Sequence, residues 1–96
     1  MKVTINGVLD EVKSAKPGKI GVTQVFHVAE FDRSGGKKIY PVLQTANTEA
    51  DLVSLKSYMG EQVNVECYLN SNDYHDANKG TKHYLSLKMI GIKRQA

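Results

Sequence analysis

Alternation of apolar and polar residues with a period of two is the feature that most constrains this chain. Val63, Val65, Cys67 and Leu69 occupy every second position, with polar or aromatic residues between them. Such alternation is typical of a β-strand with one face on a core. Turn-forming clusters such as 32–36, which ends in two glycines, separate the alternating stretches. The chain is therefore predicted to be mostly β.

Five strands are predicted, over about 2–13, 21–31, 37–45, 62–69 and 83–93. Gly7 interrupts the first and the apolar phase changes after it, so a bulge or sharp coil is expected there. Pro41 cannot donate a ladder hydrogen bond, which predicts an edge position or a bulge in the third strand. In the last strand Leu85, Leu87 and Met89 are expected to face inward. The polar segments 14–19 and 70–82 are predicted to be loops.

The period changes between Thr48 and Tyr58. Thr48 and Asp51 resemble a capping box, and Leu52 and Leu55 recur at helical spacing, so one short helix is predicted there. The resulting order β-β-β-α-β-β is that of the OB-fold, a five-stranded barrel, here a single domain over residues 1–96. An SH3-like barrel is the main alternative, but it has no natural place for this helix.

Composition sets the class of protein. At 96 residues with 41% hydrophobic and 24% charged residues, the chain fits one ordinary globular domain. The single cysteine, Cys67, excludes an internal disulfide and is expected to be a buried thiol, which fits a reducing compartment. No apolar run is long enough for a membrane span, and the N-terminus does not read as a signal peptide. A cytoplasmic protein is expected.

Charge is distributed unevenly along the chain. Residues 1–47 carry seven Lys/Arg and four acids, residues 48–78 one Lys and six acids, and residues 79–96 five Lys/Arg and no acid. This pattern suggests a basic face for a polyanion and an acidic side turned away from it. Solvated loops without a partner would also produce it.

Aromatic and basic residues interleave where an OB-fold binds oligonucleotides, on the second and third strands and in the flanking loops. A single strand needs cations along its phosphates and flat rings on which bases stack, each stack contributing roughly 1–3 kcal/mol. The candidate binding residues are Lys13, Lys16, Lys19, Phe31, Arg33, Lys37, Lys38, Tyr40, Tyr68, Tyr74, Lys79, Lys82 and Tyr84. By contrast, Phe26 and Tyr58 are expected to pack in or against the core.

No pattern for catalysis or for a cofactor is found. Segment 73–80 lacks the acid spacing of a calcium loop and the Cys/His pairs of a zinc site, so no metal is expected. There is no Ser/His/Asp order, no phosphate-cradling glycine motif and no converging acid pair. The sequence therefore predicts a protein that is not an enzyme, with no cofactor and no small-molecule substrate.

Three short stretches give the chain a resemblance to a known family: 1–5, 37–43 with Tyr40-Pro41-Val42, and 85–93. With these it is similar to the single-stranded DNA-binding, helix-destabilising proteins of filamentous phages. The resemblance implies that Tyr40 lies near DNA or the neighbouring protomer of a dimer. The sequence also ends without the acidic tail of cellular single-strand-binding proteins, which favours a phage or plasmid protein.

Taken together, these features predict a sequence-independent single-stranded DNA-binding homodimer that coats DNA in phage or plasmid replication, in the cytoplasm of a bacterial host. One alternative is an OB-like protein-interaction module of a replication or conjugation complex. RNA is a further possible ligand.

Overall fold

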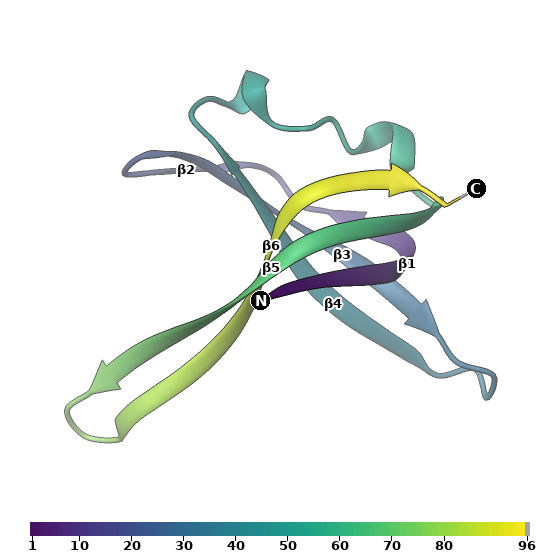
Figure 1. Cartoon of the computed structure of the whole chain (residues 1–96). Coiled ribbons are helices and arrows are strands. Elements are labelled where there is room, and N and C mark those ends of the chain that lie inside the picture. The colour runs from purple at the N-terminus through teal and green to yellow at the C-terminus, as the bar shows by residue number, and fades with distance from the viewer. Residues whose placement is uncertain (96) are drawn as a thin grey trace.

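Six strands and two short 3-10 helices make up the computed structural model, which describes residues 1–95 (Figure 1). The elements in chain order are β1 (Lys2–Val12), β2 (Lys16–Gly18), β3 (Gly21–Phe31), β4 (Lys37–Ala46), η1 (Glu49–Asp51), η2 (Lys56–Tyr58), β5 (Gln62–Asp76) and β6 (Gly80–Arg94).

The five long strands close into a barrel. The sheet order is β1-β5-β6-β4-β3-β2, and a further pairing of β1 with β3 joins its ends. The first part of β1, up to Val8, pairs with β5, and the part from Val8 to Val12 pairs with β3. One coiled strand thus belongs to both halves of the barrel, as in an OB-fold. The predicted fold class is confirmed, and β2 is a short additional strand inside the segment predicted as the first loop.

The core is apolar and lies inside the barrel. Its fully or nearly buried members are Leu9, Phe26, Val28, Val42, Leu55, Val63, Val65 and Cys67. Phe26 and Cys67 therefore occupy the buried positions predicted for them. Burial raises the pKa of the Cys67 thiol to about 11, because a thiolate would lose its hydration there.

Gly7 lies at a close approach between β1 and β3. A Cβ at this position would overlap the carbonyl oxygen of Ala29 and would lie 2.9 Å from Cγ1 of Val28. The register shift between these strands occurs later, between Leu9 and Glu11. The bulge is therefore not at Gly7, where it was predicted, but between Leu9 and Glu11. Glycine is needed at position 7 because the backbones of β1 and β3 come too close there for a Cβ.

The predicted helix at 48–58 forms two single 3-10 turns, η1 and η2, in place of one continuous helix. The buried amide of Gln44 binds the backbone between them: Val53 N donates to Gln44 Oε1 and Gln44 Nε2 donates to Val53 O, both at 3.1 Å. These bonds take the polar groups of Val53 away from a helical ladder. Leu55 is buried and Tyr58 packs against the core, as predicted for Tyr58.

Pro41 lies where β4 has a neighbour on one side. It pairs with His27 of β3, and the parallel pairing of β4 with β6 begins one residue later, at Val42. At Pro41 itself β4 is therefore an edge strand, which confirms the edge position predicted for this residue.

The prediction of a loop over 70–82 is wrong. β5 continues to Asp76 and β6 begins at Gly80, so the two strands form a hairpin that extends beyond the barrel, here called the arm, residues 70–86 (Figure 1). Cross-strand pairing holds the arm together without a core of its own. Leu85 lies on it with 72% of its surface exposed, so the inward position predicted for this residue is also wrong.

Candidate nucleic-acid interface

One face of the β5–β6 hairpin gathers tyrosines and lysines. The register pairs Tyr68 with Lys88, Asn72 with Tyr84, and Tyr74 with Lys82. Directly opposed residues share a face of an antiparallel pair, and residues two apart in a strand share it too. These side chains therefore lie on one face, where Tyr68, Tyr74 and Tyr84 are 44%, 57% and 52% exposed.

The face continues onto β1. Lys2 pairs with Tyr68, and its Nζ lies 5.8 Å from the centroid of the Tyr68 ring. The name aromatic–lysine face is used below for Lys2, Tyr68, Tyr74, Lys82, Tyr84 and Lys88. From Tyr68 to Tyr74 it extends about 20 Å along β5, at roughly 3.4 Å per residue.

Between Tyr68 and Tyr74, neutral polar residues fill the other positions of this face. Asn70 lies opposite Ser86, and Nδ2 of Asn72 donates a 3.0 Å hydrogen bond to Ser86 Oγ. On β5 the nearest acids of the same face are Glu66 and Asp76, one at each end. The central part can therefore attract an anion while its rings remain open to solvent.

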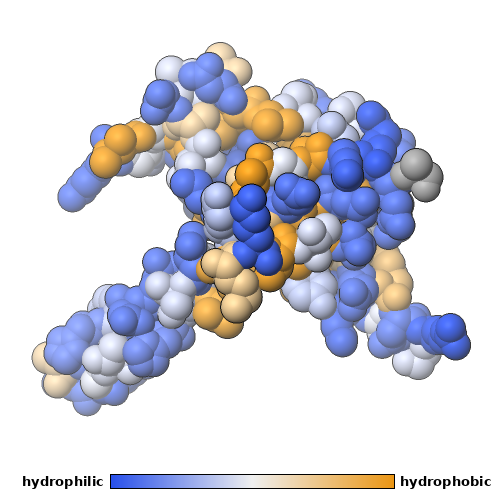
Figure 2. All heavy atoms as spheres, in the orientation of Figure 1, coloured by the Kyte–Doolittle hydropathy of each residue, from blue (hydrophilic) through white to orange (hydrophobic). Residues whose placement is uncertain are grey.

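The opposite face of the arm has a different character. His83 Nδ1 lies 2.5 Å from Asp73 Oδ1, and His75 Nδ1 lies 3.2 Å from Thr81 Oγ1. These cross-strand pairs tie the two strands together where no core does. Figure 2 shows the arm as a predominantly hydrophilic projection.

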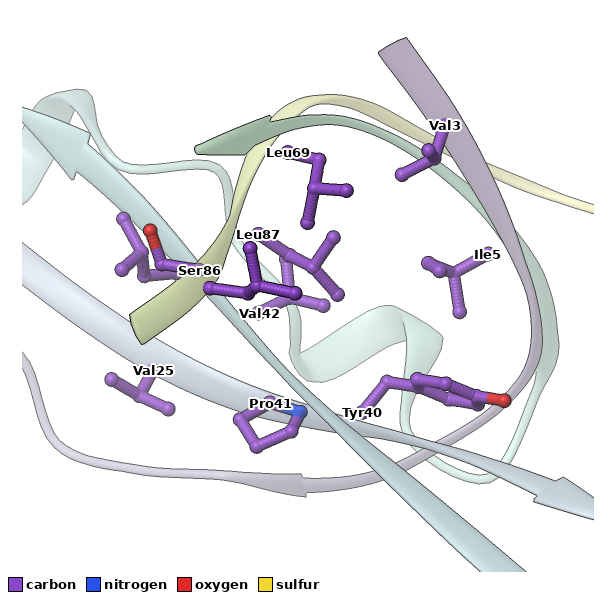
Figure 3. Close-up of a pocket in the computed structure, with 11 residues that line it drawn as sticks. Val3, Ile5, Val25, Tyr40, Pro41, Val42, Leu69, Ser86 and Leu87 are labelled. Carbon is purple, nitrogen blue, oxygen red and sulfur yellow. The ribbon is translucent and has the colours of Figure 1, made fainter. Parts of the chain in front are cut away.

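Nearer the barrel, that opposite face borders an apolar hollow of about 480 Å³ (Figure 3). Its lining residues come from five strands: Val3, Ile5, Val25, Tyr40, Pro41, Val42, Leu43, Leu69, Leu85, Ser86 and Leu87. Most of these side chains are aliphatic, so the hollow suits an apolar or aromatic group.

Tyr40 belongs to this hollow and not to the aromatic–lysine face. It pairs with Val28, whose side chain is in the core, so Tyr40 is on the inward side of β4 and is half-buried. Its hydroxyl donates a 3.5 Å hydrogen bond to Oε1 of Glu30. The candidate binding residue Tyr40 therefore lies apart from the exposed tyrosines of the aromatic–lysine face.

The β3–β4 turn forms a second basic group. Asp32 holds the turn: its Oδ1 accepts from the backbone N of Ser34 and of Gly36, at 3.0 and 2.6 Å. The hydrogen bond from the Ser34 hydroxyl, followed by that from Gly36, lowers the pKa of Asp32. Four predicted residues surround this turn: Phe31, Arg33, Lys37 and Lys38.

One of those four, Lys37, already has an ionic partner within the chain. The Lys37 ammonium is 2.9 Å from Asp10 Oδ2 and 5.9 Å from the centroid of the Phe31 ring. Lys38 lies opposite Glu30 in the register. The ion pair with Asp10 reduces what Lys37 offers to a phosphate.

A third basic group lies in the connection from β1 to β3. Lys13 and Lys16 line one small hollow with Thr23 and Val25, and Lys19 is in the turn after β2. This connection lies at the opposite end of the β3–β4 ribbon from the β3–β4 turn (Figure 1). The thirteen predicted residues therefore form three separate groups plus Tyr40, with Lys79 at the tip of the arm.

Sequence reasoning missed Lys2 and Lys88. Lys88 follows Tyr84 and Ser86 in strict alternation, so the polar phase of the last strand could have revealed it. Lys2 is adjacent to Tyr68 only through the β1–β5 pairing, which the local pattern does not contain.

Within residues 1–95 no group of three or more His, Cys, Asp or Glu side chains is placed to hold a metal ion. Over the same residues no helix is long and apolar enough to cross a membrane.

Comparison with solved structures finds the same fold in single-stranded DNA-binding proteins. The mitochondrial single-stranded DNA-binding protein Rim1 of S. cerevisiae superposes with a TM-score of 0.74 at 19% identity, covering 98% of this chain and 93% of its own. Another crystal form of Rim1 gives 0.68 at 21% identity, with 98% and 94% covered. A small single-stranded DNA-binding protein of Streptomyces coelicolor gives 0.58 at 13% identity, with 99% and 94% covered.

These likenesses show the fold. The chain has the OB-fold found in mitochondrial and bacterial single-stranded DNA-binding proteins. No protein-family model and no curated protein matches the sequence.

Proposed function

We propose that this protein binds single-stranded DNA without sequence preference, with the aromatic–lysine face as its main contact surface. The observation that carries the proposal is the alternation of exposed tyrosines with lysines along about 20 Å of one hairpin face. Rings give sequence-tolerant stacking and lysines neutralise phosphates, the two components of non-specific single-strand binding. The fold shared with Rim1 supports the same function.

The basic groups on the β1–β3 connection and on the β3–β4 turn lie apart from the aromatic–lysine face and would contact other parts of the same DNA strand. Lysines there would position the phosphate backbone without reading bases. Tyr40, in the hollow, would accept a base only if the strand passed over the barrel mouth.

The biological setting is a separate part of the proposal. We propose that the protein coats single-stranded DNA as a non-catalytic homodimer during phage or plasmid replication, in the cytoplasm of a bacterial host. The short motifs shared with filamentous-phage helix-destabilising proteins support this setting. From Lys2 to Asn6, β1 pairs only with β5, so its other edge can accept a strand of a second copy. Sedimentation should give twice the 10.6 kDa chain mass, and a persistent monomer would contradict the dimer.

Fluorescence anisotropy with labelled oligonucleotides tests the proposed function. Oligo-dT, oligo-dC and mixed sequences should bind with similar affinity, and duplex of the same length much more weakly. Oligo-U in the same series decides whether RNA is an equal ligand. Tight binding to one sequence alone would contradict sequence independence.

The apolar hollow favours a second candidate, a protein-interaction module. Its aliphatic lining would accept an apolar side chain of a partner as readily as a base. Absence of binding to any single strand at low salt would make this candidate the better one.

A further inference from the structure

Two side-chain contacts join the strands of the arm on its reverse face, opposite the aromatic–lysine face. One runs between His83 Nδ1 and Asp73 Oδ1, at 2.5 Å, and the other between His75 Nδ1 and Thr81 Oγ1, at 3.2 Å. The register pairs Asp73 with His83 and His75 with Thr81. Both contacts are therefore direct cross-strand pairs, and a single residue on each strand separates them.

The pair between these two contacts is Tyr74 with Lys82, the outermost pair of the aromatic–lysine face. Tyr84 follows His83 directly in β6. Neighbouring residues of a strand point to opposite faces, so a contact that fixes the two backbones on one face also fixes the side chains on the other. The reverse-face contacts therefore hold the tyrosines and the lysine at one spacing.

The arm has no core that could set the register of its strands. Every residue from 70 to 75 and from 80 to 85 is exposed. A slip of one residue moves every side chain of a strand to the other face, and slips are weakly opposed in strands that are polar on both sides. A two-stranded hairpin is also only marginally stable in water. The other local constraints are the turn at the tip and the hydrogen bond from Asn72 to Ser86, so each cross-strand contact weighs heavily on the register.

We infer that Asp73 and His83 are positioning residues for single-stranded DNA binding. Their cross-strand contact holds Tyr74 and Tyr84 in the arrangement in which bases can stack on both rings. The inference rests on the proposed function and adds the residues that keep the binding face in shape. As an acid beside a surface for an anion, Asp73 opposes binding electrostatically, so its charge and its positioning role predict opposite effects of removing it.

Replacement of Asp73 by alanine separates position from charge. Loss of the acid alone should favour an anion, whereas loss of the contact should misalign the tyrosines in part of the molecules. Asp73→Ala should weaken binding to oligo-dT about threefold in anisotropy titrations, the size of effect that a cross-strand charge pair has. Glu66→Ala is the matched control. Glu66 is an exposed acid of the same strand without an ion pair within residues 1–95, and its removal should leave the affinity equal or slightly raise it.

Variants of His83 add a rescue experiment. His83→Ala should weaken binding as Asp73→Ala does. His83→Asn should restore most of the affinity, because the asparagine amide keeps an N–H donor for the Asp73 carboxylate. Backbone amides of residues 70–86 should exchange hydrogen faster in both alanine variants, while those of residues 62–67 stay unchanged, since the arm lies outside the core.

The outcomes separate the positioning role from the proposed function. A parent protein that does not bind oligo-dT overturns the proposed function and the positioning role with it. A parent that binds, with Asp73→Ala binding equally or more tightly, overturns only the positioning role. An affinity of His83→Asn no higher than that of His83→Ala also overturns it, because His83 would then act without its hydrogen bond to Asp73.

Discussion

Replacing Gly7 by alanine tests how β1 and β3 close the barrel. The added Cβ would overlap the backbone oxygen of Ala29 and press on Cγ1 of Val28 at 2.9 Å. Ala29 and Val28 are both fully buried and lie in a paired strand, so neither can retreat without breaking the β1–β3 register. Overpacking of a core typically costs 1–3 kcal/mol, and a rigid backbone obstacle places this substitution at about 3 kcal/mol.

Thermal unfolding followed by circular dichroism measures the effect. For a domain of this size 1 kcal/mol shifts Tm by about 4–8 °C, so Gly7→Ala should lower Tm by roughly 12–24 °C. Gly91→Ala is the matched control: it also lies in a strand, its φ is not positive, and a Cβ there meets nothing within 4 Å. Gly91→Ala should leave Tm unchanged or raise it by the few degrees that a loss of about 0.4–1 kcal/mol of unfolded-state entropy gives. Equal Tm values for the two variants would refute the close approach as the reason for Gly7.

Three further predictions concern charge and protonation. The stabilising contribution of Asp32 should be complete above its ordinary pKa of 3.8 and lost as pH falls through the lower pKa of the folded state. Asp32→Asn and the parent should therefore converge in stability in acid. A difference in unfolding free energy that stays constant in denaturant titrations down to these acid pH values would contradict this. The Cys67 thiol should not react with a thiol reagent at pH 8 unless the protein is unfolded, and fast labelling of the native protein would contradict its burial. Lys82→Ala combined with Lys88→Ala should weaken binding to oligo-dT and to oligo-dC equally. The slope of log affinity against log salt should become shallower by about 1.4, at about 0.7 per phosphate contact. An unchanged slope would show that neither lysine contacts the DNA.

The sequence could reveal the strands that have a core face. Val63, Val65 and Cys67 alternate with polar residues, and all three are buried as that pattern predicts. The closure of five strands into an OB-fold follows from their order and from the placement of the 48–58 segment after the third long strand.

Other features depend on contacts between distant segments. The arm has no buried face, so its sequence of Asn, Asp, His and Lys resembles a loop, although cross-strand pairing makes it a hairpin. The 48–58 segment carries a helical signal, but the amide of Gln44 captures Val53 and divides it into two turns. Such tertiary overrides are invisible to local propensity.

The candidate site shows the same limit. Tyr40 lies in an almost continuous apolar run, Ile39 to Leu43, which offers no alternation from which to choose its face. The tyrosines of the arm were found by residue type, but their common face became visible only through the β5–β6 register. Lys2 is next to them only because β1 pairs with β5, where its partner Tyr68 is 66 residues away in the sequence.

Intrinsic tyrosine fluorescence tests the aromatic–lysine face most directly, because the chain has five tyrosines and no tryptophan. Single-stranded DNA should quench this fluorescence saturably. Tyr74→Leu and Tyr84→Leu should each lower the quenching amplitude, and each should weaken binding by about 1–3 kcal/mol if that ring stacks on a base. Tyr58→Leu is the control, since Tyr58 packs against the core with Arg94 4.8 Å from its ring centroid, and it should alter stability with little change in affinity. If Tyr74→Leu and Tyr84→Leu bind and quench as the parent does, the face assigned to nucleic acid is the wrong one.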